Sequence, residues 1–373
     1  MKIDLLYELQ LPKPWTKPQR EGEYEVYWQA MEQIELADRM GFDTVWLVEH
    51  HFRVERSHSP GPEIFLGAVA QRTKNIRLGH GVVLLPYPFN HPIRVAERAA
   101  VLDILSNGRL EFGTGRSTQF EQEGFRIDPE ETREMWREAL EMIPKMWMNE
   151  TFSHKGKYFD IPERNILPKP HQQPHPPMWM AATTEESFPL AGELGLGALG
   201  LTILVPLEEI AIRVESYRKA IRTAKPIGGF VNNQIGVYTM VHCAETKQQA
   251  IDNGFYDAVY WWFDRSIELR AAWDSGDRNN PVFKKYPILL KFFTKEIGPE
   301  GFDQADMVIG GDPDEVIEKI ERHEAAGLDR VLCQMQVGYI SHENIMKSME
   351  LFGKYVIPHF KAKAGKKAAA TAG

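Results

Sequence analysis

Two adjacent histidines, His50 and His51, follow the short apolar run Thr44–Val48, whose composition favours a buried strand. Neighbouring residues of an extended segment point to opposite sides, so these two imidazoles cannot chelate one ion together. No further pattern of Asp, His or Cys completes a ligand set, and we therefore predict no resident metal. An imidazole at a strand end can act as a general base or hydrogen-bond donor near neutral pH, with a structural histidine as the alternative.

Two other segments combine glycine or alanine with hydroxyl groups directly after expected strands. Gly113–Ser117 contains Arg116, which suits an anion, beside glycines that allow close backbone approach. The second segment contains Thr183, Thr184 and Ser187 just before a helix, where backbone N–H groups can hold a phosphate. An ordinary helix cap explains the second segment equally well. Taken together, the two segments are explained equally well by a site for a phosphate-bearing cofactor and by two ordinary turns.

Polar side chains also stand at the ends of the first three expected strands. As candidates to line a substrate pocket we take Tyr7, Glu8, Glu49, His80 and Asn90. The alternative for each is that it satisfies nearby backbone groups.

These residues need a scaffold that brings strand ends together, and the sequence predicts one. Apolar runs of β type occupy residues 2–7, 44–48, 76–85, 110–112, 178–181, 198–201, 234–242 and 330–336. Helical periodicity marks residues 24–40, 62–73, 92–105, 129–148, 185–194, 207–221, 246–262, 314–326 and 343–352. Near-continuous apolar strands that alternate with amphipathic helices indicate a parallel sheet covered by helices.

Eight such units predict an α/β fold of the (β/α)8 TIM-barrel type, with chemistry at the carboxyl ends of the strands. An open doubly wound sheet is the alternative, but no G-x-G-x-x-G follows the first strand. We expect one domain over residues 1–360, and a flexible tail over 361–373. Insertions are expected after the fourth helix, at about 150–177, and after the seventh strand and helix, at about 263–306.

The second insertion and the helix before it are rich in aromatic residues that could exclude water from a site. These are Trp261, Trp262, Phe263, Trp273, Phe283, Phe292 and Phe293. We expect about half of them to pack beneath the insertion instead.

Composition excludes several classes of protein. The 373 residues contain 44 Lys and Arg against 52 Asp and Glu, a net charge of −8 that argues against nucleic-acid binding. No run of 18 apolar residues suggests a membrane span, and the N-terminus lacks the features of a signal peptide. The two cysteines, Cys243 and Cys333, cannot build a disulfide framework, which fits a cytoplasmic location.

Several ordered motifs resemble one known family. They are residues 41–52 (GFDTVWLVEHHF), 76–86 (IRLGHGVVLLP), 91–97 (HPIRVAE), 102–113 (LDILSNGRLEFG) and 310–316 (GGDPDEV). Over residues 1–360 the chain resembles the bacterial luciferase-like flavin-dependent monooxygenases, which include the alkanal and limonene monooxygenases. The resemblance implies the same barrel.

The resemblance also implies a cofactor and a reaction. Reduced FMN and O2 would form a flavin C4a-hydroperoxide that oxygenates a small to medium organic substrate. His50 matches the catalytic histidine of the family. Arg116, Thr183, Thr184 and Ser187 match positions at the FMN phosphate, and Gly81–Val82 matches a non-prolyl cis peptide against the flavin ring. Residues 263–306 match a mobile loop over the site.

The sequence departs from the luciferase pattern in three places. Gly115 stands where the light-emitting subunit has a cysteine, so we do not expect luminescence. Thr183 and Thr184 replace an acidic residue and a serine, and hydroxyls suit a phosphate equally well. The spacing of residues 118–126 differs, which leaves the substrate side open.

Two alternatives to an FMN-dependent monooxygenase remain open. An F420-dependent oxidoreductase of the same superfamily would move hydride without oxygen, although Arg116 beside the hydroxyl groups favours FMN. A non-catalytic flavin-binding homologue or partner subunit is a further alternative, which His50 argues against. The resemblance implies a separate NAD(P)H:flavin reductase and a homodimer. The substrate and the type of oxygenation cannot be read from the sequence.

Overall fold

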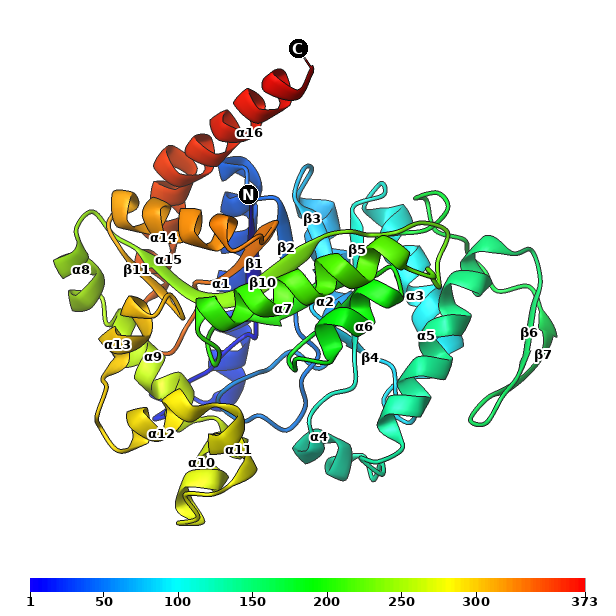
Figure 1. Cartoon of the computed structure of the whole chain (residues 1–373), viewed down its shortest axis with the longest axis horizontal. Helices are drawn as coiled ribbons and strands as arrows, with labels where there is room; N and C mark the ends of the chain where they lie inside the picture. The colour runs from blue at the N-terminus through cyan, green and yellow to red at the C-terminus, as the bar shows by residue number, and fades with distance from the viewer. Residues whose placement is uncertain (373) are drawn as a thin grey trace.

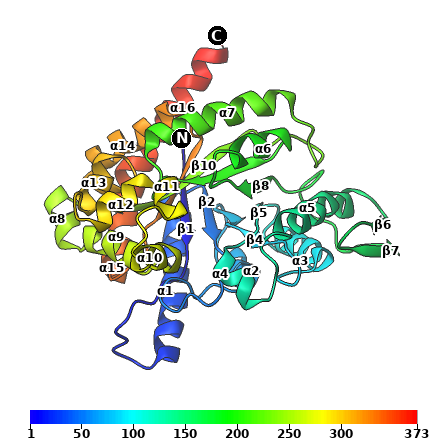
Figure 2. The same cartoon turned by 60° about the horizontal axis from the view of Figure 1, so that its bottom comes forward.

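Eight parallel strands close into a barrel (Figures 1 and 2). The computed structural model describes residues 1–372, and the side chains of 1–284 and 286–366. The barrel strands are, in order around the barrel, β1 (Lys2–Tyr7), β2 (Thr44–Leu47), β3 (Arg77–His80), β5 (Leu110–Gly115), β8 (Met178–Ala181), β9 (Gly197–Leu201), β10 (Ile235–Cys243) and β12 (Arg330–Gln334). Arg330 of β12 pairs with Lys2 on one side and Gly236 on the other, which closes the barrel. The predicted (β/α)8 fold is confirmed.

A helix on the outside of the barrel follows each of these strands. The eight helices are α1 (Gln19–Met40), α2 (Pro62–Arg72), α3 (Pro92–Leu105), α5 (Thr132–Met148), α6 (Ser187–Glu193), α7 (Leu207–Ala220), α14 (Pro313–Ala325) and α15 (His342–Leu351). Their buried faces pack against the strands in one large apolar core. A short 3-10 helix, η1 (Ile221–Thr223), extends α7.

The structure corrects two of the expected elements. The strand expected over residues 76–85 is interrupted after β3 by a cis peptide between Gly81 and Val82, and resumes as β4 (Val83–Leu84), paired with β5. The helix expected over 246–262 is divided into α8 (Lys247–Asp252) and α9 (Phe255–Asp264). Gly254 separates them with φ 82°, a left-handed conformation that ends the first helix.

Both predicted insertions are present. In the first, β6 (Phe152–Lys155) and β7 (Asp160–Arg164) form an antiparallel hairpin that stands out at one edge of the molecule (Figure 1). The second consists of α10 (Ile267–Asp274), α11 (Pro281–Lys285), α12 (Pro287–Phe293) and α13 (Pro299–Gln304). It is followed by β11 (Ile309–Gly311), which pairs with the end of β10. This second group gathers at one end of the barrel (Figure 2).

The chain ends in α16 (Ile357–Ala372), which follows the π-helical turn η2 (Phe352–Val356) and projects from the body (Figure 1). Residues 361–372 are thus helical rather than irregular, and residue 373 lies outside the described residues. The flexibility expected for this tail stays a prediction. None of the helices within residues 1–372 combines the length and the apolar character needed to cross a membrane.

The amino-terminal half of the barrel interior is filled by a buried polar plug. Arg330 and the Trp46 indole both donate to Asp4 Oδ2, at 2.8 and 2.9 Å, and all three side chains are fully buried. The Trp46 ring also joins the plug to a cluster of six apolar side chains: Leu6, Trp46, Val48, Trp179, Leu199 and Leu332. Space for a ligand therefore lies at the carboxyl ends of the strands, as in other barrels of this type.

The aromatic residues of the second insertion mostly pack against one another. Phe263 stacks on Phe302 with ring centroids 4.7 Å apart, and Trp273 stacks on Phe293 at 5.1 Å. Trp262 instead lies over the guanidinium of Arg56 in the loop after β2. This indole, unlike the internal stacks, covers a residue of the barrel mouth.

Candidate active site

His50 lies directly after β2 and is paired with a buried carboxylate, Glu121. The Nδ1 atom is 2.9 Å from Glu121 Oε1, and the Glu121 side chain is fully buried. An ionised carboxylate can only accept hydrogen bonds, so Nδ1 carries the proton. In the neutral imidazole this leaves the lone pair on Nε2, which is the atom free to exchange a proton with a ligand.

Glu121 belongs to α4 (Gln119–Gly124), a short helix after β5, and receives several other donors. The His51 N–H donates to Oε1 at 2.7 Å, and the Ser117 and Thr118 hydroxyls donate to Oε2 at 2.7 and 3.0 Å. Burial alone would raise the pKa of Glu121, but the hydrogen bond and charge of His50, the charge of Arg53 and the His51 N–H together lower the pKa. The carboxylate is therefore ionised across the physiological range.

Glu121 was not among the predicted site residues. The local signal was present, because Thr118 and Glu121 form a capping box at the start of α4. That signal indicates a helix start and nothing about His50, which lies 71 residues away in the sequence.

The His51 side chain makes contacts different from those of His50. Its ring stacks on Phe89 with centroids 5.8 Å apart and meets Phe125 edge-on at 4.8 Å. Within the described residues, no group of three or more His, Cys, Asp or Glu side chains could hold a metal ion.

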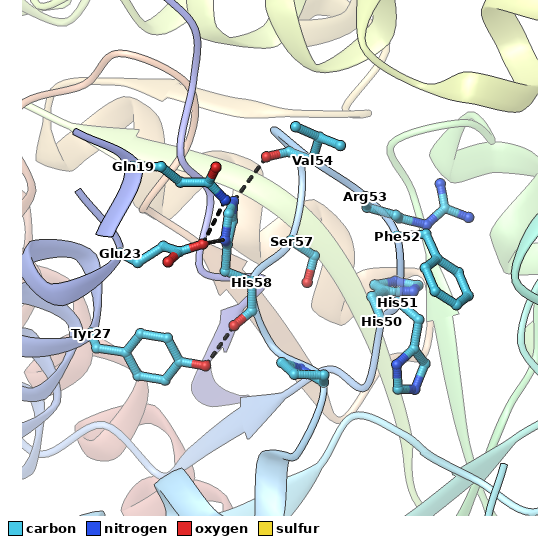
Figure 3. Close-up of a pocket in the computed structure, with 11 residues that line it drawn as sticks. Gln19, Glu23, Tyr27, His50, His51, Phe52, Arg53, Val54, Ser57 and His58 are labelled. Carbon is cyan, nitrogen blue, oxygen red and sulfur yellow. Dashed lines mark hydrogen bonds and ion pairs between the residues drawn. The ribbon is translucent and has the colours of Figure 1, made fainter. Parts of the chain in front are cut away.

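A hollow of about 520 Å³ lies beside the histidines, between the start of α1 and the loop after β2. His50, His51 and Phe52 lie on one side of it, and Gln19, Glu23 and Tyr27 lie on the other (Figure 3). His58 is fixed between these two sides. Its Nδ1 is 3.2 Å from Glu23 Oε1, and its backbone oxygen accepts the Tyr27 hydroxyl at 2.6 Å.

Glu49 and Asn90, two predicted pocket residues, hold the backbone of β4 directly after the cis peptide. Glu49 Oε2 accepts the Leu84 N–H at 2.8 Å. The Asn90 amide donates to Glu49 Oε1 and to the Leu84 carbonyl, each at 2.9 Å. These two residues thus position the Gly81–Val82 segment.

Glu8 lies at the barrel mouth in a buried ion pair with Arg56, whose Nη2 donates to Oε1 at 3.0 Å. Burial alone would raise the pKa of Glu8, but the charges of Arg56 and His50 and the hydrogen bonds lower it to about 2. The charge of His50 is thus one of the charges that act on Glu8, although no hydrogen bond or ion pair joins the two among the described residues.

Tyr7 and His80 lie instead in the layer between the barrel and its helices. The Tyr7 hydroxyl donates to Gln33 of α1 at 3.0 Å, and His80 packs edge-on against Phe112 at 5.7 Å. Burial lowers the pKa of His80 to about 4. Tyr7 is kept from the mouth by strand alternation, because adjacent residues of a strand point to opposite sides and Glu8 faces the mouth. Neither residue joins the groups at the mouth.

The residues predicted to hold an anion lie on neighbouring strand ends. β5 and β8 pair with Thr114 opposite Met180, so Arg116 and the Thr183–Thr184 segment extend from adjacent strands. Arg116 is exposed and donates to the Thr132 hydroxyl at 3.3 Å. Partial burial and the nearby charge of Arg133 lower the pKa of Arg116. Among the described side chains, no carboxylate is recorded as a partner of Arg116.

Ser187 holds the turn that contains Thr183 and Thr184. Its hydroxyl donates to the Thr184 carbonyl at 2.7 Å and accepts the Thr184 N–H at 3.0 Å. A Cβ atom added to Gly115 would lie 2.4 Å from Val82 Cγ2, so this glycine allows the cis peptide segment to approach β5. Arg116, the hydroxyl groups and the close backbone approach fit a phosphate-bearing cofactor.

The fold and these strand-end groups define a class of protein. The family described as luciferase-like monooxygenase matches residues 11–330, and the chain belongs to this family. It is therefore an enzyme of the luciferase-like monooxygenase family.

Individual relatives agree with this assignment. The chain is 27% identical to the oxygenase component of a flavin-dependent trigonelline monooxygenase from Acinetobacter baylyi, over 90% of each chain. It is 30% identical to limonene 1,2-monooxygenase from Rhodococcus erythropolis, over 94% of this chain and 86% of that one. The crystal structure of monooxygenase RslO1 from Streptomyces bottropensis superposes with a TM-score of 0.76 at 27% identity, covering 96% of this chain and 100% of that chain.

Proposed function

We propose that this enzyme uses reduced FMN and O2 to insert one oxygen atom into a small to medium organic substrate. When bound, reduced FMN activates O2 for this transfer. The observation that carries the proposal is the His50–Glu121 pair, because it fixes the proton on Nδ1 and leaves Nε2 for exchange at the strand ends. His50 Nε2 would accept or return the proton that oxygen transfer requires.

The residues that would hold FMN come from three consecutive strand ends. Arg116, with Thr183, Thr184 and Ser187, would bind the phosphate. Gly81 and Val82 would lie against the flavin ring, held in place by Glu49 and Asn90. The free cation and the absence of a side chain at Gly115 support this arrangement.

A separate NAD(P)H:flavin reductase would supply the reduced FMN. The trigonelline relative is itself described as an oxygenase component, which supports a separate reductase. A cytoplasmic location belongs to the same proposal, because NAD(P)H is available there.

A homodimer would form through the exposed apolar side chains of α2 and α3. These helices pack against each other and expose Ile64, Val101, Ile104 and Leu105. Exposed apolar side chains on two adjacent helices support an interface at this face.

Cofactor titration tests the proposal. FMN and F420 are titrated separately into wild type and His50→Ala, and flavin fluorescence is recorded. We expect FMN to bind wild type and variant with the same affinity, while turnover is lost only in the variant. Tight binding of F420 without FMN binding would reject the FMN proposal in favour of a hydride-transferring enzyme.

A further inference from the structure

The polar contacts that hold β4 extend outward to the helices α2 and α3. Glu49 and Asn90, which bind the backbone of Leu84, lie at the inner end of these contacts. Arg98 of α3 and Glu63 of α2 lie at the outer end. A continuous set of hydrogen bonds therefore joins two helices on the outside of the barrel to the segment proposed to contact the flavin ring.

Both backbone groups of Leu84 are bound by side chains. The N–H donates to Glu49 Oε2 at 2.8 Å, and the carbonyl accepts the Asn90 amide at 2.9 Å. The same amide also donates to Glu49 Oε1 at 2.9 Å, so the three residues form a closed set of hydrogen bonds. Leu84 is buried and lies two residues after Val82 in the chain. This set of bonds therefore fixes one end of the proposed flavin segment.

The strand that contains Leu84 depends on these side chains more than the other barrel strands do. β4 consists of only two residues and pairs with β5 alone among the described strands. In that pairing Val83 lies opposite Thr114 and Leu84 lies opposite Gly115. Since β4 has a strand neighbour on one side only, Glu49 and Asn90 supply the hydrogen bonds that a second neighbour would otherwise make.

This set of bonds requires one orientation of the Asn90 amide. The amide nitrogen must face two acceptors, Glu49 Oε1 and the Leu84 carbonyl, and the amide oxygen must face away from them. Arg98 imposes this orientation, because its Nη2 donates to Asn90 Oδ1 at 2.6 Å and a guanidinium has donors only. The reversed amide would place its nitrogen against the Arg98 donor and its oxygen against two acceptors. The guanidinium therefore decides which way Asn90 points.

Arg98 is itself fixed in place by contacts on its other nitrogens. Its Nη1 donates to Glu63 Oε1, and its Nε donates to the Arg94 carbonyl one turn earlier in α3 at 3.2 Å. A planar guanidinium that is bound at several nitrogens has little freedom to turn. Arg98 can therefore act as a fixed support for Asn90.

We propose that Arg98 is a positioning residue for the flavin ring: by orienting Asn90, it holds residues 81–84 in the form that receives the ring. This inference rests on the proposed function, because it concerns the same cofactor site. Arg98 acts through Asn90 and has no part in the proposed phosphate contacts. Its loss should therefore weaken binding of the ring and leave the contribution of the phosphate unchanged.

Arg98→Met tests this inference, because it keeps a long unbranched side chain and removes the donors. Oxidised FMN and riboflavin are titrated into the protein, and their affinities are measured by calorimetry. FMN binding should weaken roughly five-fold. Riboflavin, which has the same ring without the phosphate, should lose affinity by the same factor. No loss for either ligand, or a loss for FMN alone, would overturn the inference.

Arg94→Met is the matched control. Arg94 lies on the same helix and forms an ion pair with Glu97, but its side chain is 67% exposed. This variant also exchanges an arginine for methionine on α3 and leaves Asn90 with its donor. Its affinities for FMN and riboflavin should match those of wild type. Equal losses in the two variants would assign the effect to α3 as a whole and contradict a specific role of Arg98.

Hydrogen exchange provides a readout that needs no ligand. In Arg98→Met the Asn90 amide is free to reverse, so the Leu84 N–H should exchange faster than in wild type. The amides of β5 that bond to other barrel strands should exchange at the wild-type rate. Unchanged exchange at Leu84, or faster exchange throughout β5, would overturn the inference.

The two measurements together separate this inference from the proposed function. FMN binding by wild type that Arg98→Met leaves unchanged would reject only the role of Arg98. Absence of FMN binding by wild type would reject FMN as the cofactor, and with it the role of Arg98 in flavin binding, even if exchange at Leu84 becomes faster in the variant.

Discussion

The proton on His50 Nδ1 is held by one carboxylate, and replacing that carboxylate tests its role directly. In Glu121→Gln the amide group can donate to Nδ1, which would move the imidazole proton to Nε2. We expect turnover to fall roughly 100-fold, because the base needed for proton exchange is then lost. The FMN dissociation constant should be unchanged. The pH dependence of turnover should also change, which a purely structural role of Glu121 would not cause.

Glu123→Gln is the matched control for this prediction. Glu123 lies on the same short helix, α4, but is exposed, and its carboxylate accepts the Gln119 amide at 2.8 Å. Its turnover and pH profile should match those of wild type. Equal losses in the two variants would assign the effect to α4 as a whole rather than to the His50 partner.

His80 makes the stability of the protein depend on pH. Its pKa is about 4 in the folded protein, because burial disfavours the charged ring, against about 6.5 in an unfolded chain. The unfolded chain therefore binds more protons between these values, so the free energy of unfolding falls as pH decreases from about 6.5 to about 4. The loss attributable to His80 is about 3 kcal/mol.

His80→Phe measures this contribution. The variant keeps a ring beside Phe112 and removes the titrating group. Urea denaturation at several pH values should show a shallower decline than in wild type, with the remaining slope due to other buried histidines such as His242. An unchanged slope would show that His80 does not titrate between the two states.

At the scale of elements, α10 is attached to the part of the chain that contains His50. Arg53 donates to both Glu268 oxygens, at 3.3 and 2.7 Å, and to the Thr118 hydroxyl at 2.7 Å. Arg53 also lies 3.5 Å from Glu121 Oε1. The covering insertion is therefore connected through one guanidinium to the carboxylate that holds His50.

Glu268→Ala should loosen this cover. Loss of the partly buried ion pair is worth about 1 kcal/mol, or about a five-fold change in the ratio of closed to open arrangements. More water would reach the site, and more hydrogen peroxide should be released per NADH consumed by the coupled reductase. Asp274→Ala removes an exposed ion pair with Arg270 on the same helix and should leave peroxide release unchanged. Equal peroxide release in Glu268→Ala and wild type would contradict this role.

The elements were largely predictable because local patterns determine them. Apolar runs and helical periodicity located all eight barrel strands. Strand alternation implies that only one of Tyr7 and Glu8 faces the mouth, but the choice depends on how the barrel is closed. Glu121 was missed because its contact with His50 exists only in the tertiary structure.

At the scale of the whole molecule, the α2–α3 surface tests the proposed dimer. Ile64 is 78% exposed and Leu105 is 51% exposed, although both are apolar. The double variant Ile64→Lys/Leu105→Lys should be monomeric in sedimentation velocity, whereas wild type should be dimeric, because charges at an apolar interface are costly. Ile212→Lys on α7, where Ile212 is 69% exposed, is the control and should remain dimeric. A monomeric wild type would reject the dimer.

The most direct test of the proposed function is the fate of molecular oxygen. Protein, FMN, NADH and a flavin reductase are incubated under oxygen-18 with a panel of small organic substrates, and the products are examined by mass spectrometry. We predict a product that contains one oxygen-18 atom, formed by wild type and not by His50→Ala. Formation of a product without oxygen-18, or equal oxygen-18 incorporation by His50→Ala, would contradict the proposed oxygen transfer at His50.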